Sequence, residues 1–294
     1  QDNIIDYAFG DINGDGFKEL IYFISNGFNY LPRRIFAYDL KNDSLITSPE
    51  LGGHFGPVDI RDIDNDGLPE FAVSNYGSGN INNDSLPMQD TCAYLIVLDN
   101  NLQFLFPPIP SIGRYNGMQN KFIQDGDSSY IVSFWNKEGV TPGELMLGVY
   151  DRRGKVLNQK FFPPEFRNEK SMLSVFKNEK GKERILLKPR FTKLMAFDSK
   201  LNEVKGSDIK TGENGLFQFD FDNDGKQELL FQSIKPEQWV ILRNNLRFPV
   251  YFEASGTQLT PQIYTITNAA RKQQISIHMQ NREYVFEYEP NTLY

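Results

Sequence analysis

Three nine-residue segments of the chain share one acidic pattern, at residues 11–19, 62–70 and 220–228. Each has oxygen-bearing side chains at positions 1, 3, 5 and 9 and a Gly at position 6, which permits a sharp turn. The backbone carbonyl of position 7 adds a further oxygen. Because crowded carboxylates repel one another unless a cation binds them, the spacing predicts three calcium sites. Their ligands would be Asp11, Asn13, Asp15, Phe17 and Glu19; Asp62, Asp64, Asp66, Leu68 and Glu70; and Asp220, Asp222, Asp224, Lys226 and Glu228.

The residues that flank these segments separate two kinds of calcium loop. An EF-hand loop has a bidentate Glu at position 12 and a helix on each side. Here position 12 is Tyr22, Val73 or Phe231, and each segment is followed by a short apolar run. Short β-rich runs on both sides of a tight loop are typical of a hairpin. The sequence therefore predicts calcium-binding β-hairpins.

The three segments resemble the FG-GAP or VCBS-type repeats, whose hairpin loops bind calcium in integrin-like β-propellers. In the first segment Asn13 stands where an acid is usual, and Glu replaces the more usual Asp at position 9 of all three. Both changes retain an oxygen donor. The resemblance implies an all-β fold, a six- or seven-bladed β-propeller.

Further hairpins recur between the acidic segments and extend the repeat. One kind contains an Asp after an apolar run, as at Asp39, Asp99, Asp151 and Asp198. Another kind retains two strands and a turn but lacks the ligand set. Together they make about six repeats of four strands, the spacing of propeller blades. Residues 1–294 are expected to form a single propeller domain.

Charge and cysteine usage restrict the partners and the location. Three calcium ions would bring the formal charge of −7 to about −1, so nucleic acid is not an expected partner. The single cysteine, Cys92, excludes an internal disulfide. Weak calcium loops are useful where calcium is plentiful, at roughly millimolar levels outside the cytosol. We expect an extracytoplasmic protein: periplasmic, cell-surface or secreted.

If the resemblance holds, the calcium hairpins lie on one face of the disc, and other loops surround the opposite entrance. Those loops supply aromatic, amide and charged groups, the usual composition of a ligand mouth. The residues predicted to bind a glycan, peptide or protein ligand are His54, Phe55, Arg114, Tyr115 and Asn214. The pair Arg33-Arg34, in contrast, is expected to be solvated.

Two classes of function fit the sequence. The favoured class is a non-catalytic ligand-binding, sensing or adhesion module. Within this class, the disulfide-free chain with its aromatic C-terminal end looks like the sensor region of a bacterial membrane receptor such as a histidine kinase. A following segment would then tether the chain to the membrane. The alternative is a polysaccharide lyase or glycosidase, which needs a carboxylate pair or a base beside a cation. Its candidate residues are Glu169, Lys170, Glu213, Arg114 and His54.

Overall fold

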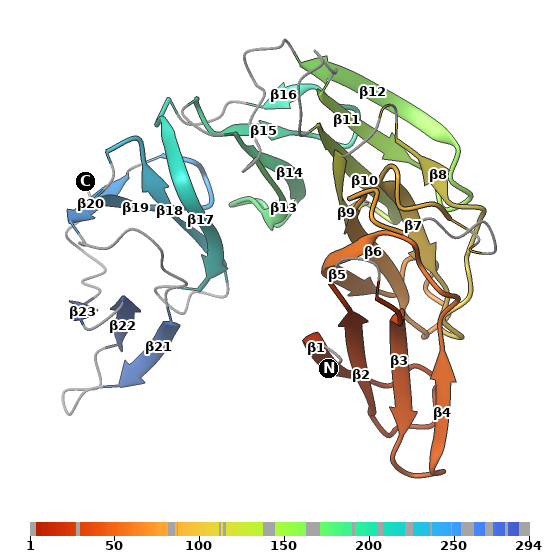
Figure 1. Cartoon of the computed structure of the whole chain (residues 1–294). Helices are drawn as coiled ribbons and strands as arrows, with labels where there is room; N and C mark the ends of the chain where they lie inside the picture. The colour runs from red at the N-terminus through yellow and green to blue at the C-terminus, as the bar shows by residue number, and fades with distance from the viewer. Residues whose placement is uncertain are drawn as a thin grey trace. The chain divides into compact units, whose positions relative to one another are not determined.

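A computed structural model gives the fold of the chain (Figure 1). It describes residues 4–27, 30–81, 86, 88–111, 113, 116–137, 145–162, 171–189, 192–204, 208–220, 226–235, 237–247, 249–253, 262–267, 273–279 and 282–287. All regular elements within these ranges are strands. None of the described residues belongs to a helix with the length and hydropathy needed to cross a bilayer. The chain divides into two compact units, residues 1–169 with 199–201, and residues 170–198 with 202–294.

The first unit contains two antiparallel sheets, drawn from red to green in Figure 1. One is a four-stranded meander in the order β1-β2-β3-β4. The other has the order β12-β11-β10-β9-β6-β7-β8, with β5 paired to β6. The strands are β1 (Ile4–Gly10), β2 (Glu19–Ser25), β3 (Arg33–Asp39), β4 (Ser44–Thr47), β5 (His54–Arg61), β6 (Glu70–Tyr76), β7 (Tyr94–Leu98), β8 (Ile109–Pro110), β9 (Asn116–Asp125), β10 (Ser128–Lys137), β11 (Leu145–Tyr150) and β12 (Val156–Phe162).

The larger sheet consists of two four-stranded meanders that join at β6 and β9. Asn75 and Tyr76 at the end of β6 pair with Met118 and Gly117 of β9. One residue further along, a side chain takes part in place of the ladder, because the backbone N–H of Asn120 donates to Ser74 Oγ at 3.0 Å. The buried Asn120 Oδ1 has no hydrogen-bond partner, so these contacts satisfy only part of the polar groups at the junction.

The core of the first unit explains why its strands are apolar. Phe71 and Val73 of β6 pack with Ile21 and Ile35 from the first sheet. Ala72 projects from the other face of the same strand, toward a second cluster that includes residues of β9 to β11. A strand that is buried on both faces needs a continuous apolar run. Burial of each large apolar side chain contributes roughly 1.5–3 kcal/mol to the stability of the fold.

The second unit repeats the four-stranded meander, in the orders β13-β14-β15-β16 and β17-β18-β19-β20, and contains a three-stranded sheet, β21-β22-β23. Its strands are β13 (Met172–Lys177), β14 (Glu183–Lys188), β15 (Met195–Phe197), β16 (Glu203–Val204), β17 (Thr211–Phe219), β18 (Glu228–Ser233), β19 (Gln238–Leu242), β20 (Val250–Glu253), β21 (Gln262–Thr267), β22 (Gln273–Met279) and β23 (Arg282–Glu287). Phe231 and Trp239 are fully buried in it. Four-stranded antiparallel meanders in both units confirm the predicted all-β class.

The turns after β7 and β11 share one hydrogen-bond pattern. After β7, Asp99 Oδ1 accepts the N–H groups of Asn101 and Gln103 at 2.9 and 2.8 Å. After β11, Asp151 Oδ1 accepts two N–H groups in the same way. Leu102 adopts a φ of 60° in the first of these turns, an unusual conformation for a branched residue, and its side chain is fully buried. The recurrent Asp is therefore a turn former.

Candidate metal centre

Loop 1 (residues 11–19) connects β1 to β2, as the hairpin prediction requires. Asp11 forms its first turn, because its two carboxylate oxygens accept the N–H groups of Gly14 and Gly16 at 2.7 and 2.9 Å. These glycines have φ values of 77° and 83°, which a residue without Cβ adopts freely. At the end of the loop, Glu19 Oε2 accepts the N–H of Ile12 at 2.7 Å. The side chains at positions 1 and 9 are thus held by the loop's own backbone.

Loop 2 (residues 62–70) connects β5 to β6 and repeats this arrangement position by position. Asp62 accepts the N–H groups of Asn65 and Gly67 at 2.7 and 3.0 Å. Glu70 Oε2 accepts the N–H of Ile63 at 2.9 Å. The correspondence extends to position 4, where Asn65 has a φ of 62° and occupies the same left-handed region as Gly14.

The inner positions of the two loops also match. At position 3, Asn13 and Asp64 accept the N–H of the residue two places later, at 2.9 and 3.3 Å. At position 5, Asp15 and Asp66 accept the N–H groups of Phe17 and Leu68, at 2.9 and 2.8 Å. Five side-chain contacts to the backbone therefore recur in two loops of different sequence. In both loops these contacts hold the side chains of positions 1, 3, 5 and 9 against the same backbone arrangement.

The electrostatics of loop 2 favour a bound cation. One carboxylate oxygen from each of Asp62, Asp64 and Glu70 lies within 4.8 Å of the others. Burial raises the pKa of Glu70 to about 7, aided by the charges of Asp64, Asp66 and Asp62 and opposed by the hydrogen bond from Ile63. A cation among these oxygens would offset both the burial and the repulsion. The donor set, all oxygen and mostly carboxylate, fits calcium.

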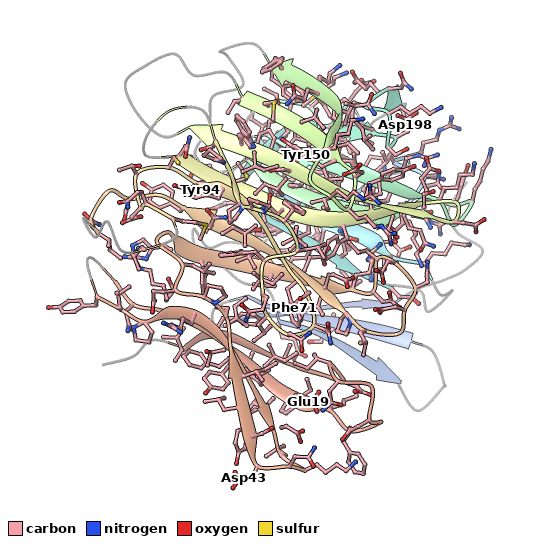
Figure 2. The ribbon with its side chains drawn as sticks, turned by 90° about the vertical axis from the view of Figure 1, so that its right-hand side faces the viewer. Glu19, Asp43, Phe71, Tyr94, Tyr150 and Asp198 are labelled. Carbon is pink, nitrogen blue, oxygen red and sulfur yellow. The ribbon has the colours of Figure 1, made fainter. Side chains whose placement is uncertain are left out.

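Loop 1 balances its charge in a different way. The Asn13 amide donates to Glu19 Oε1 at 3.4 Å and to Asp39 Oδ2 at 3.3 Å. Lys41 Nζ lies 2.9 Å from Asp15 Oδ2 and 4.2 Å from the centre of the Phe17 ring. The hydrogen bond from Lys41 lowers the pKa of Asp15, as does the backbone N–H of Phe17. Figure 2 shows Glu19 and Asp43, from the turn that contains Lys41, at the same end of this sheet.

Loop 3 (residues 220–228) is described only at its ends. It connects β17 to β18, which confirms a hairpin here. Glu228 is 5% exposed, comparable with Glu19 and Glu70. Asp222 and Asp224 lie outside the described residues, whereas Asp220 and Lys226 lie within them. The calcium site predicted at loop 3 stays a prediction.

The residues predicted to bind a ligand are not brought together by the described part of the structure. His54 begins β5, and Phe55 is 9% exposed, within the core cluster that contains Phe71. Arg114 and Tyr115 lie outside the described residues, as does the side chain of Asn214 on β17. Recognition at these positions stays a prediction. Of the residues suggested for an enzyme, Glu169 and Lys170 also lie outside, so that alternative stays open as well.

A buried ion pair that the sequence analysis missed lies beside His54. Arg33, expected to be solvated, is fully buried, and its Nη1 lies 3.4 Å from Oδ2 of the equally buried Asp90. Arg33 Nη2 lies 3.0 Å from His54 Nε2. Because a guanidinium has only donors, the neutral imidazole is the acceptor here. The alternation of β3 was a usable signal, since Arg33 lies on the same face as the buried Ile35.

Comparisons with known proteins support a fold for the chain but show no family. No protein-family model matches the chain, and no curated protein matches it. Among solved structures, BBS1N in complex with ARL6DN, soaked with mercury, is 13% identical, with a TM-score of 0.52 over 97% of this chain and 82% of that chain. A protein of unknown function from Bacteroides caccae is 15% identical, with a TM-score of 0.47 over 86% of this chain and 80% of that one. The V. cholerae biofilm matrix protein Bap1 is 14% identical, with a TM-score of 0.38 over 98% and 69%. The first likeness supports a β-propeller-like, all-β fold for this chain.

Proposed function

We propose that the chain is an extracytoplasmic calcium-binding β-propeller of the FG-GAP type that acts as a ligand-binding, sensing or adhesion module. The observation that carries the proposal is the recurrence of five side-chain-to-backbone hydrogen bonds in loops 1 and 2. A solvated turn can form without four oxygen-bearing side chains held at these positions. In both loops the frame coincides with the spacing of a calcium ligand set.

The side chains at positions 1, 3, 5 and 9 would hold the ion, together with the carbonyl of position 7. In loop 2 these are Asp62, Asp64, Asp66, Glu70 and Leu68. Loop 3 would bind a third ion with the same positions. A bound ion neutralises the carboxylates and fixes two strands at their shared loop, which stiffens the hairpin. Calcium is favoured over magnesium because flexible, carboxylate-rich cages suit the larger ion.

The location and the architecture follow from the same proposal. Loops of this kind bind weakly enough to need roughly millimolar calcium, which is found outside the cytosol. The repeated meanders would be blades of one six- or seven-bladed ring that spans residues 1–294. The chain would be the recognition part of a larger assembly, tethered to a membrane by a following segment.

Metal content and calorimetry test the calcium proposal directly. We expect three calcium ions per chain at millimolar supply, with bond lengths of about 2.3–2.6 Å in a crystal structure of the loaded protein. Asp62→Ala should remove one ion and leave the others, because the loops are local structures. A chain that binds no calcium, or that binds zinc in its place, would sink the proposal.

Ligand recognition needs a separate test at the predicted entrance. We expect a glycan or peptide array to detect a ligand for the calcium-loaded chain. Substitution of Arg114 and Tyr115 by Ala should weaken that binding with little effect on calcium affinity, because exposed loop positions contribute little to stability. Asp62→Ala serves as the control, since it changes calcium binding at loop 2 and leaves Arg114 and Tyr115 in place. An array that stays blank would contradict the binding role.

A further inference from the structure

A cavity of about 170 Å³ opens beside loop 1 in the first unit. Its polar wall comes from the turns that follow β3 and β7: Asp39 and Ser44 from one, Asn100 and Asn101 from the other. Asn100 is fixed in place because its amide donates to the carbonyl of Ile12 at 3.1 Å. The wall offers a carboxylate, a hydroxyl and two amides, so it can accept and donate several hydrogen bonds at once.

The carboxylate in this wall is buried and already arranged. Asp39 is 7% exposed. Its Oδ1 accepts the N–H groups of Lys41 and Asn42 at 2.9 and 3.0 Å, and its Oδ2 accepts the side-chain amides of Asn42 and Asn13 at 2.7 and 3.3 Å. These neutral donors fix its rotamer. A bound hydroxyl would donate to Oδ2 in place of the longer contact from Asn13.

Besides these groups and the side chains of Asn13 and Glu19, the cavity has an apolar part. Ile12, Ala37 and Ile46 line it. Ala37 is 1% exposed and leaves room that a longer side chain would occupy. A hollow with one hydrogen-bonding wall and one aliphatic wall suits a small ring that has hydroxyls at its edge and C–H groups on its face.

The equivalent positions beside loop 2 carry larger side chains. Ala37 pairs with Ile21, two residues after Glu19, and Val97 pairs with Ala72, two residues after Glu70. Valine therefore stands where loop 1 has alanine.

The turn residues differ in the same direction. Ser44 pairs with Asp39, and Gln103 exchanges backbone and side-chain bonds with Asp99. Glutamine stands where loop 1 has serine. The smaller residues at these two matched positions leave more space beside loop 1.

We propose that this cavity is a subsite for one pyranose unit of a glycan. Its volume lies below the roughly 300 Å³ at which drug-sized ligand pockets begin, which is appropriate for a single sugar ring. The subsite rests on the recognition role proposed above and is an additional contact beside loop 1, besides the entrance predicted at Arg114 and Tyr115. Because Asn13 and Glu19 belong both to loop 1 and to the cavity lining, a sugar bound here would lie next to the ion.

Binding of methyl pyranosides to the full chain tests the subsite. The probes are the methyl glycosides of glucose, galactose and mannose, measured by saturation-transfer NMR and calorimetry in calcium and in chelator. We expect at least one to bind in the millimolar range. Ser44→Gln and Ala37→Val, each of which copies the loop 2 residue, should weaken that binding at least about tenfold. Arg152→Gln, a control beside loop 2 that lies outside the cavity lining, should leave it unchanged.

The outcomes separate this proposal from the calcium proposal, because calcium binding and thermal unfolding are measured on the same samples. No binding of any pyranoside at high millimolar concentration overturns the subsite, whatever the calcium result. Binding that both filling variants leave intact also overturns it, because the sugar would then lie elsewhere. Sugar binding that both filling variants abolish in a chain that binds no calcium would keep the subsite and overturn the calcium cages.

Discussion

Loop 1 and loop 2 have the same backbone hydrogen bonds and different charge. Loop 2 has four carboxylates, three of which offer oxygens within 4.8 Å of one another. Loop 1 has Asn13 at position 3, and the ammonium of Lys41 lies 2.9 Å from Asp15. Loop 2 has a weaker ion pair of this kind, because Arg152 lies 3.5 Å from Asp64 and is more exposed. Loop 2 therefore has one more carboxylate and a longer ion pair than loop 1.

This difference indicates that the geometry of a loop and its net charge are set separately. The backbone contacts involve only carboxylate and amide oxygens as acceptors, so Asn13 and Asp64 serve equally. Calcium, by contrast, responds to the number of charged ligands. We infer that both loops fold in the same way and that loop 2 binds calcium more tightly.

Removal of calcium should have the largest effect. At calcium concentrations about 100-fold above Kd, each occupied loop adds about 2.7 kcal/mol to the unfolding free energy of its unit. Chelation should therefore lower the melting temperature, and Asp64→Ala should abolish the part of that shift that comes from loop 2 while leaving a folded protein. Differential scanning fluorimetry with and without chelator measures both. A melting curve that chelator does not move would show that neither loop is a cage.

Exchange of the position 3 residues should reverse the order of calcium affinity of the two loops. Asn13→Asp should tighten calcium at loop 1 by about tenfold, and Asp64→Asn should weaken it at loop 2 by a similar factor. Without calcium, Asn13→Asp should also destabilise the chain, because it replaces a donor to Glu19 and Asp39 with a third carboxylate. Calorimetric titration of both variants checks the order. Unchanged affinities would mean that ligand charge does not decide which loop binds calcium more tightly.

Removal of Lys41 should have a smaller effect. An exposed ion pair contributes about 0.2–1 kcal/mol, so Lys41→Gln should raise calcium affinity at loop 1 by up to about fivefold. The gain should shrink in high salt, which screens the pair. Arg152→Gln is the control at loop 2 and should change affinity less, because its contact is longer and more exposed. A larger gain in calcium affinity from Arg152→Gln than from Lys41→Gln would show that Arg152 opposes calcium binding more strongly than Lys41 does.

Acidification should also act at the other end of the strands, where His54 begins β5. Burial and the charge of Arg33 lower the pKa of His54 from its ordinary value of 6.5, while Asp90 opposes them. The unfolded chain therefore takes up a proton more readily, and the unfolding free energy falls as the pH drops through 6.5 toward the lower folded pKa. His54→Gln should flatten this decline without changing calcium affinity at either loop. Denaturant titrations at several pH values measure it, and an equal decline in the variant would assign the proton to another group.

Much of the fold could be predicted from residue pattern. The apolar run at Phe71–Val73 predicts a buried strand, and β6 is buried on both faces. The turn at Asp99 was visible as a repeated Asp, although its role in accepting backbone N–H groups came from the structure. The burial of Arg33 was missed although the alternation of β3 indicated it. Its partner Asp90, by contrast, lies far along the chain, beyond the reach of any local pattern.

The sequence by itself determined the loops, because every contact that shapes them joins residues no more than seven apart. Such contacts depend only on residue type and spacing. Tertiary structure decided what surrounds each loop, since Asn13 meets Asp39 across 26 residues and Arg152 meets Asp64 across 88. Strand pairing and sheet packing set those encounters, and they depend on the whole chain. Hence the ligand spacing was readable in advance, whereas Lys41 on loop 1 and the hollow beside it were not.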